Sequence, residues 1–74
     1  MKPLDLNMSV YEATQKYPEL IGIIAGWGFP QIRNNYLRRT VGRRYTMKQA
    51  IRELNLDEET IVRRLQNQGF QIVQ

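Results

Sequence analysis

Residues 17–30, which read YPELIGIIAGWGFP, decide the fold. Pro18 lacks an amide hydrogen, so it cannot continue a preceding helix, but it suits the first turn of a new one. Residues 20–27 are apolar or glycine on nearly every side, so a helix there must be central to the core. Gly28 stands where a helix commonly ends in a left-handed residue, and Pro30 prevents continuation. The stretch predicts a short central helix.

A second short helix is predicted just before this one. Ser9 and Glu12 have the spacing of a capping box, in which the hydroxyl accepts from the amide of Glu12 and the carboxylate reaches back. Apolar or small residues then recur at i, i+3, i+4 and i+7, which is one face of a helix. They are Val10, Ala13, Thr14 and Tyr17. The first part of the chain is therefore a helix pair over residues 9–29.

The last part of the chain repeats this pattern. Thr46 and Gln49 repeat the capping-box spacing, and Asp57 is a candidate N-cap for a further helix. The apolar faces of these helices are Met47, Ala50, Ile51 and Leu54, then Ile61, Val62 and Leu65, with Gly69 and Phe70 at the end. We interpret residues 9–29 and 46–70 as pseudo-repeated helix pairs joined by a basic connector, residues 30–45. The alternative is that any two capped amphipathic helix pairs look alike.

The fold class predicted for residues 1–74 is a single all-α domain, a compact bundle of about five short helices. A fifth helix is expected within the connector, ending at Gly42, and residues 71–74 alternate as a strand-like or loose tail. So short a chain buries only roughly 60% of its extended surface, so a small core must hold it. The expected core residues are Val10, Ala13, Tyr17, Leu20, Ile21, Ile24, Trp27, Phe29, Met47, Ala50, Ile51, Leu54, Ile61, Leu65 and Phe70.

The composition excludes several kinds of chemistry. The chain has no cysteine and no histidine, which removes disulfides, thiolate metal sites and the commonest general base. Its single serine, Ser9, is explained as a helix cap, and residues 57–59, Asp-Glu-Glu, suit a helix N-terminus. We therefore expect no enzymatic activity, no metal site and no cofactor.

The charge is concentrated in one segment. The net charge is +4, yet residues 33–52 hold seven basic residues and no acid. Such asymmetry favours an anionic contact. Guanidinium groups bind carboxylate or phosphate through paired hydrogen bonds, and backbone amides near a glycine can add donors. The candidate ligand-binding residues are Asn34, Arg38, Arg39, Thr40, Gly42, Arg43 and Arg44.

Three interpretations of this segment stay open. It could bind a small anionic ligand or an acidic partner surface, it could bind nucleic acid with Tyr36 and Tyr45 stacking on bases, or it could be a solvated basic face. A helix-turn-helix over residues 46–65 is a further interpretation, but Ile51 occupies a position that needs a small residue. The acidic residues 57–59 would also meet phosphates first. An ordinary helix pair is the better interpretation.

Several short motifs carry a family resemblance. Residues 17–20 (YPEL), Gly28-Phe29, Thr46-Met47 and Ala50 follow one another as in a bacterial domain family. The chain resembles, over residues 5–68, the domain of unknown function related to the hybrid-cluster-protein-associated redox disulfide domain. The resemblance implies a compact helical fold.

The resemblance also says which branch of the family is nearer. The redox branch carries a CxxC pair, which by spacing would fall near Gln31 and Asn34, so its thiol chemistry does not carry over. The cysteine-free branch has an Asn-x-x-x-Arg-x-Thr-x-Gly arrangement, matched here by Asn34, Arg38, Thr40 and Gly42. That branch is associated with hemerythrin-like and PAS-type sensor proteins, which implies a regulatory or ligand-sensing accessory.

The expected location is the cytoplasm. The opening residues lead into polar sequence, unlike a secretory signal, and the longest apolar run, residues 20–29, is too short to span a membrane. Because that run is apolar nearly all round, self-association into a homo-oligomer is also expected.

Overall fold

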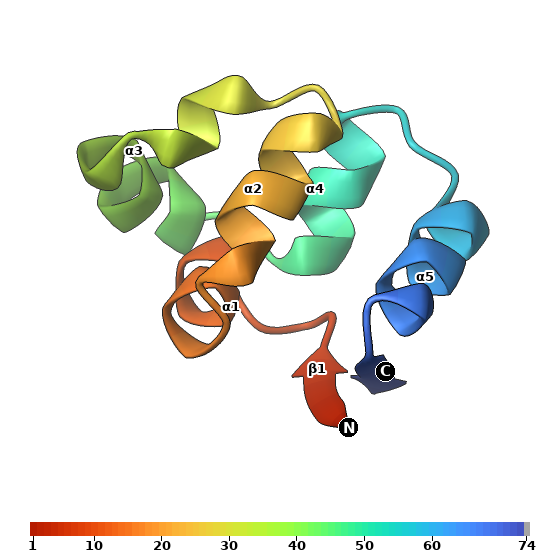
Figure 1. The fold of residues 1–74 in the computed structure, drawn as a ribbon. Helices are drawn as coiled ribbons and strands as arrows, with labels where there is room; N and C mark the ends of the chain where they lie inside the picture. Colours follow the sequence, from red (N-terminus) through yellow and green to blue (C-terminus); the bar gives the residue numbers. More distant parts are fainter. Residues whose placement is uncertain (74) are drawn as a thin grey trace.

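The computed structural model describes residues 1–73, which form five α-helices and two short β-strands (Figure 1). The helices are α1 (Val10–Lys16), α2 (Glu19–Gly26), α3 (Asn35–Thr40), α4 (Met47–Glu53) and α5 (Glu58–Asn67). The strands are β1 (Lys2–Asp5) and β2 (Phe70–Val73), and two short 3₁₀-helices, η1 (Pro30–Arg33) and η2 (Val41–Arg43), flank α3. The prediction of about five short helices in a compact bundle is confirmed. The all-α class is wrong in one respect, because two strands pair.

The two strands bring the described ends of the chain together. β1 and β2 lie parallel, with Lys2 opposite Phe70 and Asp5 opposite Val73. Leu4 points inward from β1 and is fully buried. The strand-like interpretation of the tail is confirmed for residues 71–73, while Gln74 lies outside the described residues. β1 was missed because a four-residue strand containing a proline is a weak local signal.

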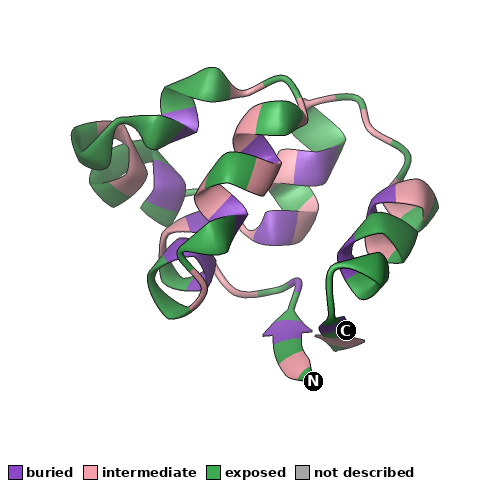
Figure 2. Ribbon diagram, viewed as in Figure 1, coloured by how far each residue is buried: buried purple, intermediate pink, exposed green. Residues whose placement is uncertain are grey.

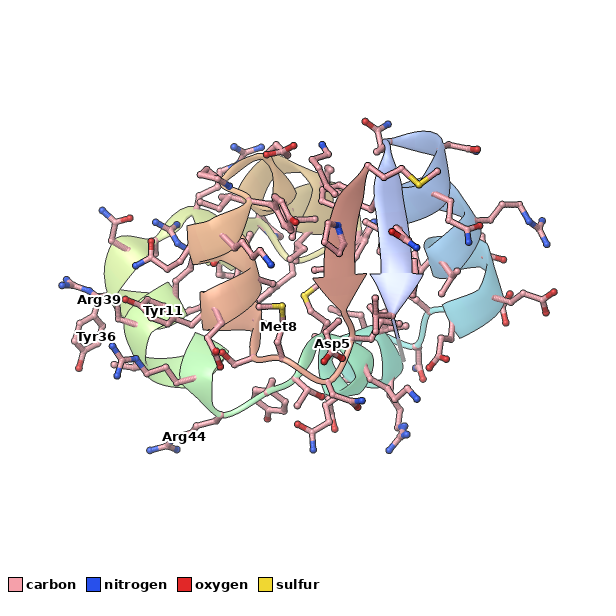
Figure 3. All side chains as sticks on the ribbon, turned by 90° about the horizontal axis from the view of Figure 1, so that it is seen from below. Asp5, Met8, Tyr11, Tyr36, Arg39 and Arg44 are labelled. Atoms are coloured by element: carbon pink, nitrogen blue, oxygen red, sulfur yellow. The ribbon has the colours of Figure 1, made fainter. Side chains whose placement is uncertain are left out.

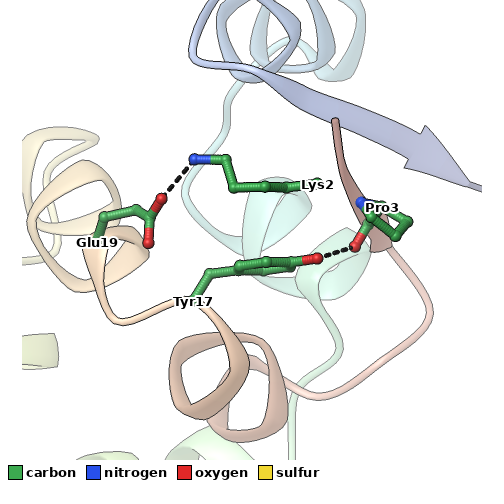
Figure 4. Close-up of polar contacts among 4 residues, drawn as sticks. All are labelled: Lys2, Pro3, Tyr17 and Glu19. Carbon is green, nitrogen blue, oxygen red and sulfur yellow. Dashed lines mark hydrogen bonds and ion pairs between the residues drawn. The ribbon is translucent and has the colours of Figure 1, made fainter.

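Side-chain contacts fasten β1 to the junction between α1 and α2 (Figure 4). The hydroxyl of Tyr17 donates to the carbonyl oxygen of Pro3 at 2.7 Å, and the ring of Tyr17 meets Phe70 edge-on at 5.2 Å between centroids. The ammonium of Lys2 lies 2.5 Å from Oε2 of Glu19 and lowers the pKa of that carboxyl group. Since Pro3 has no amide hydrogen and its carbonyl is occupied, these contacts also close the outer edge of β1.

Three helices, α1, α4 and α5, begin where the sequence indicates. The amide of Glu12 donates to the Ser9 hydroxyl at 3.0 Å, and the amide of Thr60 donates to Asp57 at 3.2 Å. The capping box is complete only at Thr46, where the Gln49 amide donates to the hydroxyl and the Thr46 amide donates to the Gln49 side chain. At Ser9 the Glu12 carboxylate instead accepts from the hydroxyl, at 3.2 Å.

The starts of α1 and α4 are bonded to each other. Ser9 and Thr46 form an antiparallel bridge. The amide of Val10 donates to the carbonyl of Tyr45, and the amide of Met47 donates to the carbonyl of Met8, both at 2.9 Å. The two bonds are reciprocal, and each residue is matched by one 37 positions along the chain, which is also the spacing between Ser9 and Thr46, the caps of the two predicted helix pairs.

The core lies between α1, α2, α4 and α5, whose inner faces are buried (Figure 2). Its buried apolar residues are Leu4, Leu6, Val10, Ala13, Leu20, Ile24, Ile32, Met47, Ile51, Ile61, Leu65 and Phe70. Five predicted core residues are only partly buried and pack against it, namely Tyr17, Ile21, Trp27, Phe29 and Ala50. Leu54 is also only half-buried. In so small a domain no further layer covers the outer side of α2.

Glycine ends both helix pairs. Gly28 follows the C-cap of α2 with φ of +109°, and Gly69 follows the C-cap of α5 with φ of +94°. Both values lie in the left-handed region that favours glycine. Pro18 is the N-cap of α2 and not its first residue, so the helix begins at Glu19, one residue later than predicted. No helix within residues 1–73 is both long and apolar enough to cross a membrane.

Candidate anion-binding site

The basic connector is an ordered segment built around α3. Asn34 is the N-cap of α3, and its side-chain oxygen accepts from the amide of Leu37 at 3.1 Å. Thr40 ends the helix, and its hydroxyl donates to the carbonyl of Tyr36 at 2.9 Å. Both side chains therefore satisfy their own helix, a role that these residue types commonly play.

Gly42 sits where the connector touches α1. It is buried, and a Cβ atom there would lie 3.4 Å from the backbone nitrogen of Tyr11. This close approach fixes η2 against the first turn of α1. Of the motif Asn34, Arg38, Thr40 and Gly42, all residues but Arg38 thus act in the connector through backbone contacts of their own helix or of α1.

Arg38 joins two elements of the connector and still has donors that could bind a ligand. Its Nη1 donates to the carbonyl of Ile32 at 2.7 Å, and its Nη2 donates to the side-chain oxygen of Asn35. These bonds join η1 to α3 and hold the guanidinium group in one orientation. A guanidinium group has five N–H donors, so further donors are left for a ligand.

Arg38 and Arg39 face α1 across a polar pocket of about 260 Å³. We call this the polar pocket; its lining residues are Tyr11, Gln15, Asn35, Arg38 and Arg39. Arg43 stands beside it, with its guanidinium carbon 4.5 Å from the centroid of the Tyr11 ring. Arg44 extends away from Tyr11 and Arg39 into solvent (Figure 3). The structure therefore brings Arg38, Arg39 and Arg43 together and leaves Arg44 apart.

The pKa of the Tyr11 phenol is lowered by groups in and beside the polar pocket. The side-chain amide of Gln15 donates to the Tyr11 oxygen at 2.7 Å. This hydrogen bond is the largest cause of a lowered pKa of Tyr11, followed by hydrogen bonding from Arg43 and the charges of Arg43 and Arg39. A lowered tyrosine pKa means that the surroundings favour a negative oxygen at this position.

Sequence reasoning missed Tyr11, Gln15 and Asn35. Tyr11 and Gln15 are four residues apart on α1, so they share a helix face. One available signal was Tyr11 itself, an aromatic residue outside the apolar face of its helix. Nothing in the sequence shows that this face meets the connector.

The described residues contain neither a candidate metal site nor a buried polar side chain that lacks a hydrogen-bond partner. Within residues 1–73 no cluster of three or more histidine, cysteine, aspartate or glutamate side chains could hold a metal ion. In the same part of the chain, every buried side-chain nitrogen or oxygen has a hydrogen-bond partner.

The fold and the polar pocket define a small helical domain with a basic face, and comparison identifies its family. Residues 4–62 match the domain of unknown function DUF1858, and the chain belongs to that family. It is similar to a conserved domain protein from Streptococcus pneumoniae TIGR4, whose crystal structure superposes with a TM-score of 0.91. The two share 30% identity over 99% of this chain and 92% of that one. The chain has no match among curated proteins.

Proposed function

We propose that this protein is a non-enzymatic binding module that holds an anionic group in the polar pocket. The observation that carries the proposal is the convergence of Arg38, Arg39 and Arg43 on Tyr11 without a carboxylate partner. Within residues 1–73 the ion pairs are Lys2 with Glu19 and Arg63 with Glu59. The acids near the start of α5 therefore form no ion pair with the connector.

The geometry suits a phosphate or a carboxylate, either free or on an acidic partner protein. Arg38 is already held in one orientation by two hydrogen bonds, so less conformational entropy is lost when it binds a ligand. Arg39 is exposed and adds a second guanidinium group. The Tyr11 hydroxyl, which accepts from Gln15, has its own hydrogen free to donate.

The test is a calorimetric titration with inorganic phosphate, nucleotides and organic acids at low ionic strength. Replacing Arg39 by alanine should weaken binding about tenfold, which is the usual worth of a hydrogen bond to a charged group. Arg63→Ala is the matched control, because it removes the same charge from an exposed position outside the polar pocket. Equal weakening by both variants, or no binding at all, would contradict the proposal.

Nucleic-acid binding is the second candidate, and the exposure of Tyr36 favours it. The side chain is 71% exposed, and it lies three residues before Arg39 on the same face of α3 (Figure 3). A base could stack on the ring while Arg39 holds a phosphate. Oligonucleotide affinity that falls steeply with salt and is lost in Tyr36→Ala would put this candidate first.

We also propose a regulatory role, because the cysteine-free branch that this chain resembles is associated with hemerythrin-like and PAS-type sensor proteins. A sensor protein of that kind is the proposed partner, and the cytoplasm is the proposed location. A relation to the redox disulfide domain is proposed with them. Gln31 lies in η1 and Asn34 is the N-cap of α3, so the positions proposed for the cysteines of the redox branch both lie just before α3. The chain holds no thiol there, which leaves recognition as the proposed role.

A further inference from the structure

A second cavity lies on the other side of the contact between Gly42 and α1. It has a volume of about 230 Å³ and opens between the end of α2, the connector and α4. We call it the apolar cleft. The lining residues that matter here are Phe29, Val41, Tyr45, Ala50, Glu53 and Leu54.

The apolar cleft gathers apolar surface that the fold leaves uncovered. Phe29, Ala50 and Leu54 have the spacing of core residues, yet all three are only half-buried. Val41 and Tyr45 are 37% and 39% exposed. A small domain has little apolar surface to bury, so leaving five such side chains around one concavity forgoes stabilisation. An occupant with an apolar group would recover it.

The rim of the apolar cleft carries one charge. Among the described lining residues Glu53 is the only charged one. Its carboxylate has no ion-pair partner within residues 1–73. Arg43 and Arg44 lie between Gly42 and Tyr45 in the chain, but neither lines the apolar cleft, so Glu53 is the charge that an occupant meets directly. A cation held directly at Glu53 is therefore favoured over an anion.

We propose that the apolar cleft binds a small aryl or alkyl amine. The apolar group packs against Phe29 and Leu54, and the ammonium group meets Glu53 at the rim. The volume is below the 300–1,000 Å³ of drug-sized pockets, so one small ring or a short branched chain fills it. This site differs from the polar pocket in residues and in the sign of the charge that it selects.

A second copy of the chain is the less favoured occupant. The most exposed apolar side chains, Met1 and Tyr36, are 98% and 71% exposed and do not line the apolar cleft. A two-fold dimer that used them would need each copy to reach the cleft of the other, because the contacts in such a dimer are reciprocal. A small ligand needs no such arrangement.

The test is a set of amide chemical-shift titrations with phenethylamine, phenethyl alcohol and hydrocinnamate, which share a ring and differ in charge. We expect saturable shifts at Val41, Gly42, Ala50 and Leu54, with affinity falling in the order amine, alcohol, carboxylate. Glu53→Gln should weaken the amine about two- to fivefold and leave the alcohol unchanged, because the ion pair is partly exposed.

A substitution that fills the apolar cleft tests whether the ligands bind there. Ala50→Leu adds a side chain inside the apolar cleft and should weaken all three ligands about tenfold or more. Gln66→Leu is the control, since it adds leucine at an exposed position of α5. Non-saturable shifts, preference for the carboxylate, or binding unaffected by Ala50→Leu would overturn the proposal. So would shifts of the cleft amides with protein concentration alone, which would show a second copy there.

Discussion

The polar pocket and the apolar cleft lie on either side of the contact between Gly42 and Tyr11, but they have no lining residue in common. Tyr11 lines the polar pocket, and the neighbouring Val10 and the buried Gly42 line the apolar cleft. Successive residues of a helix point about 100° apart, so one turn of α1 supplies a wall to each. The connector also lines both cavities: Arg38 and Arg39 line the polar pocket, and Val41 and Tyr45 line the apolar cleft. A segment that looks merely basic in sequence thus forms two surfaces of opposite chemistry.

The largest expected effect comes from the floor of the apolar cleft. Ile24 lines it and is fully buried, so Ile24→Ala should lower the free energy of unfolding by about 2–5 kcal/mol. Urea denaturation followed by circular dichroism measures the change. Tyr36→Ala, on the exposed side of α3, should stay within about 0.5 kcal/mol of the parent. Similar losses for both would mean that the apolar cleft is not backed by the core.

The next effect tests the contact that both sites share. Gly42→Val places a branched side chain against the backbone of Tyr11 and should destabilise the protein by about 1–3 kcal/mol. Gly42→Ala should be much milder, because its Cβ would sit at ordinary contact distance. Gly22→Val is the control for adding valine in open space, since no atom lies within 4 Å of a Cβ there. Thermal unfolding of the three variants would show whether the position or the residue type matters.

The helix pairs could be predicted because their signals are local. Ser9, Thr46 and Asp57 each reveal a cap within four residues, and Gly28 and Gly69 mark two helix ends. The parallel pairing of β1 with β2 joins opposite ends of the chain, and no local pattern specifies such a partner. Leu4 and Leu6 were therefore missing from the predicted core.

The candidate site could be predicted only in part, for the same reason. The run of basic residues was enough to predict Arg38, Arg39 and Arg43. Tyr11 and Gln15 lie near them only because Gly42 lets the connector approach α1. The position of Asn34, three residues before Leu37, also fits a helix cap, and its side-chain oxygen accepts from the Leu37 amide. Asn34, predicted only as a ligand-binding residue, is thus also the cap of α3.

A smaller effect separates the two cavities. Asn34→Ala removes the cap of α3 and should lower stability by about 1 kcal/mol. Because α3 carries Arg38 and Arg39, phosphate binding in the polar pocket should weaken, while phenethylamine binding in the apolar cleft should not. Asn34→Ser keeps a capping oxygen and should restore phosphate affinity. Loss of both ligands in Asn34→Ala would show that the cavities are not independent.

The smallest effect is the titration of Tyr11. Its pKa lies below the ordinary tyrosine value, chiefly because Gln15 donates to the phenol oxygen, with Arg43 and Arg39 adding to the effect. Phenolate absorbance measured against pH should therefore contain an early component that Tyr11→Phe removes. Gln15→Ala should move that component to higher pH more than Arg43→Ala does. Tyr36→Phe, outside the polar pocket, should leave it unchanged.

The sign of this shift predicts how pH acts on the site. A lowered pKa means that the ionised phenol stabilises the fold above the unfolded-state pKa, and that this contribution is lost as pH falls through the folded pKa. At pH values above the pKa of Tyr11, the phenolate places a negative charge against the arginines that would hold the ligand. Phosphate affinity should therefore fall as pH rises through the pKa of Tyr11, and Tyr11→Phe should remove that fall. If both proteins lose affinity in parallel, the anion does not bind beside Tyr11.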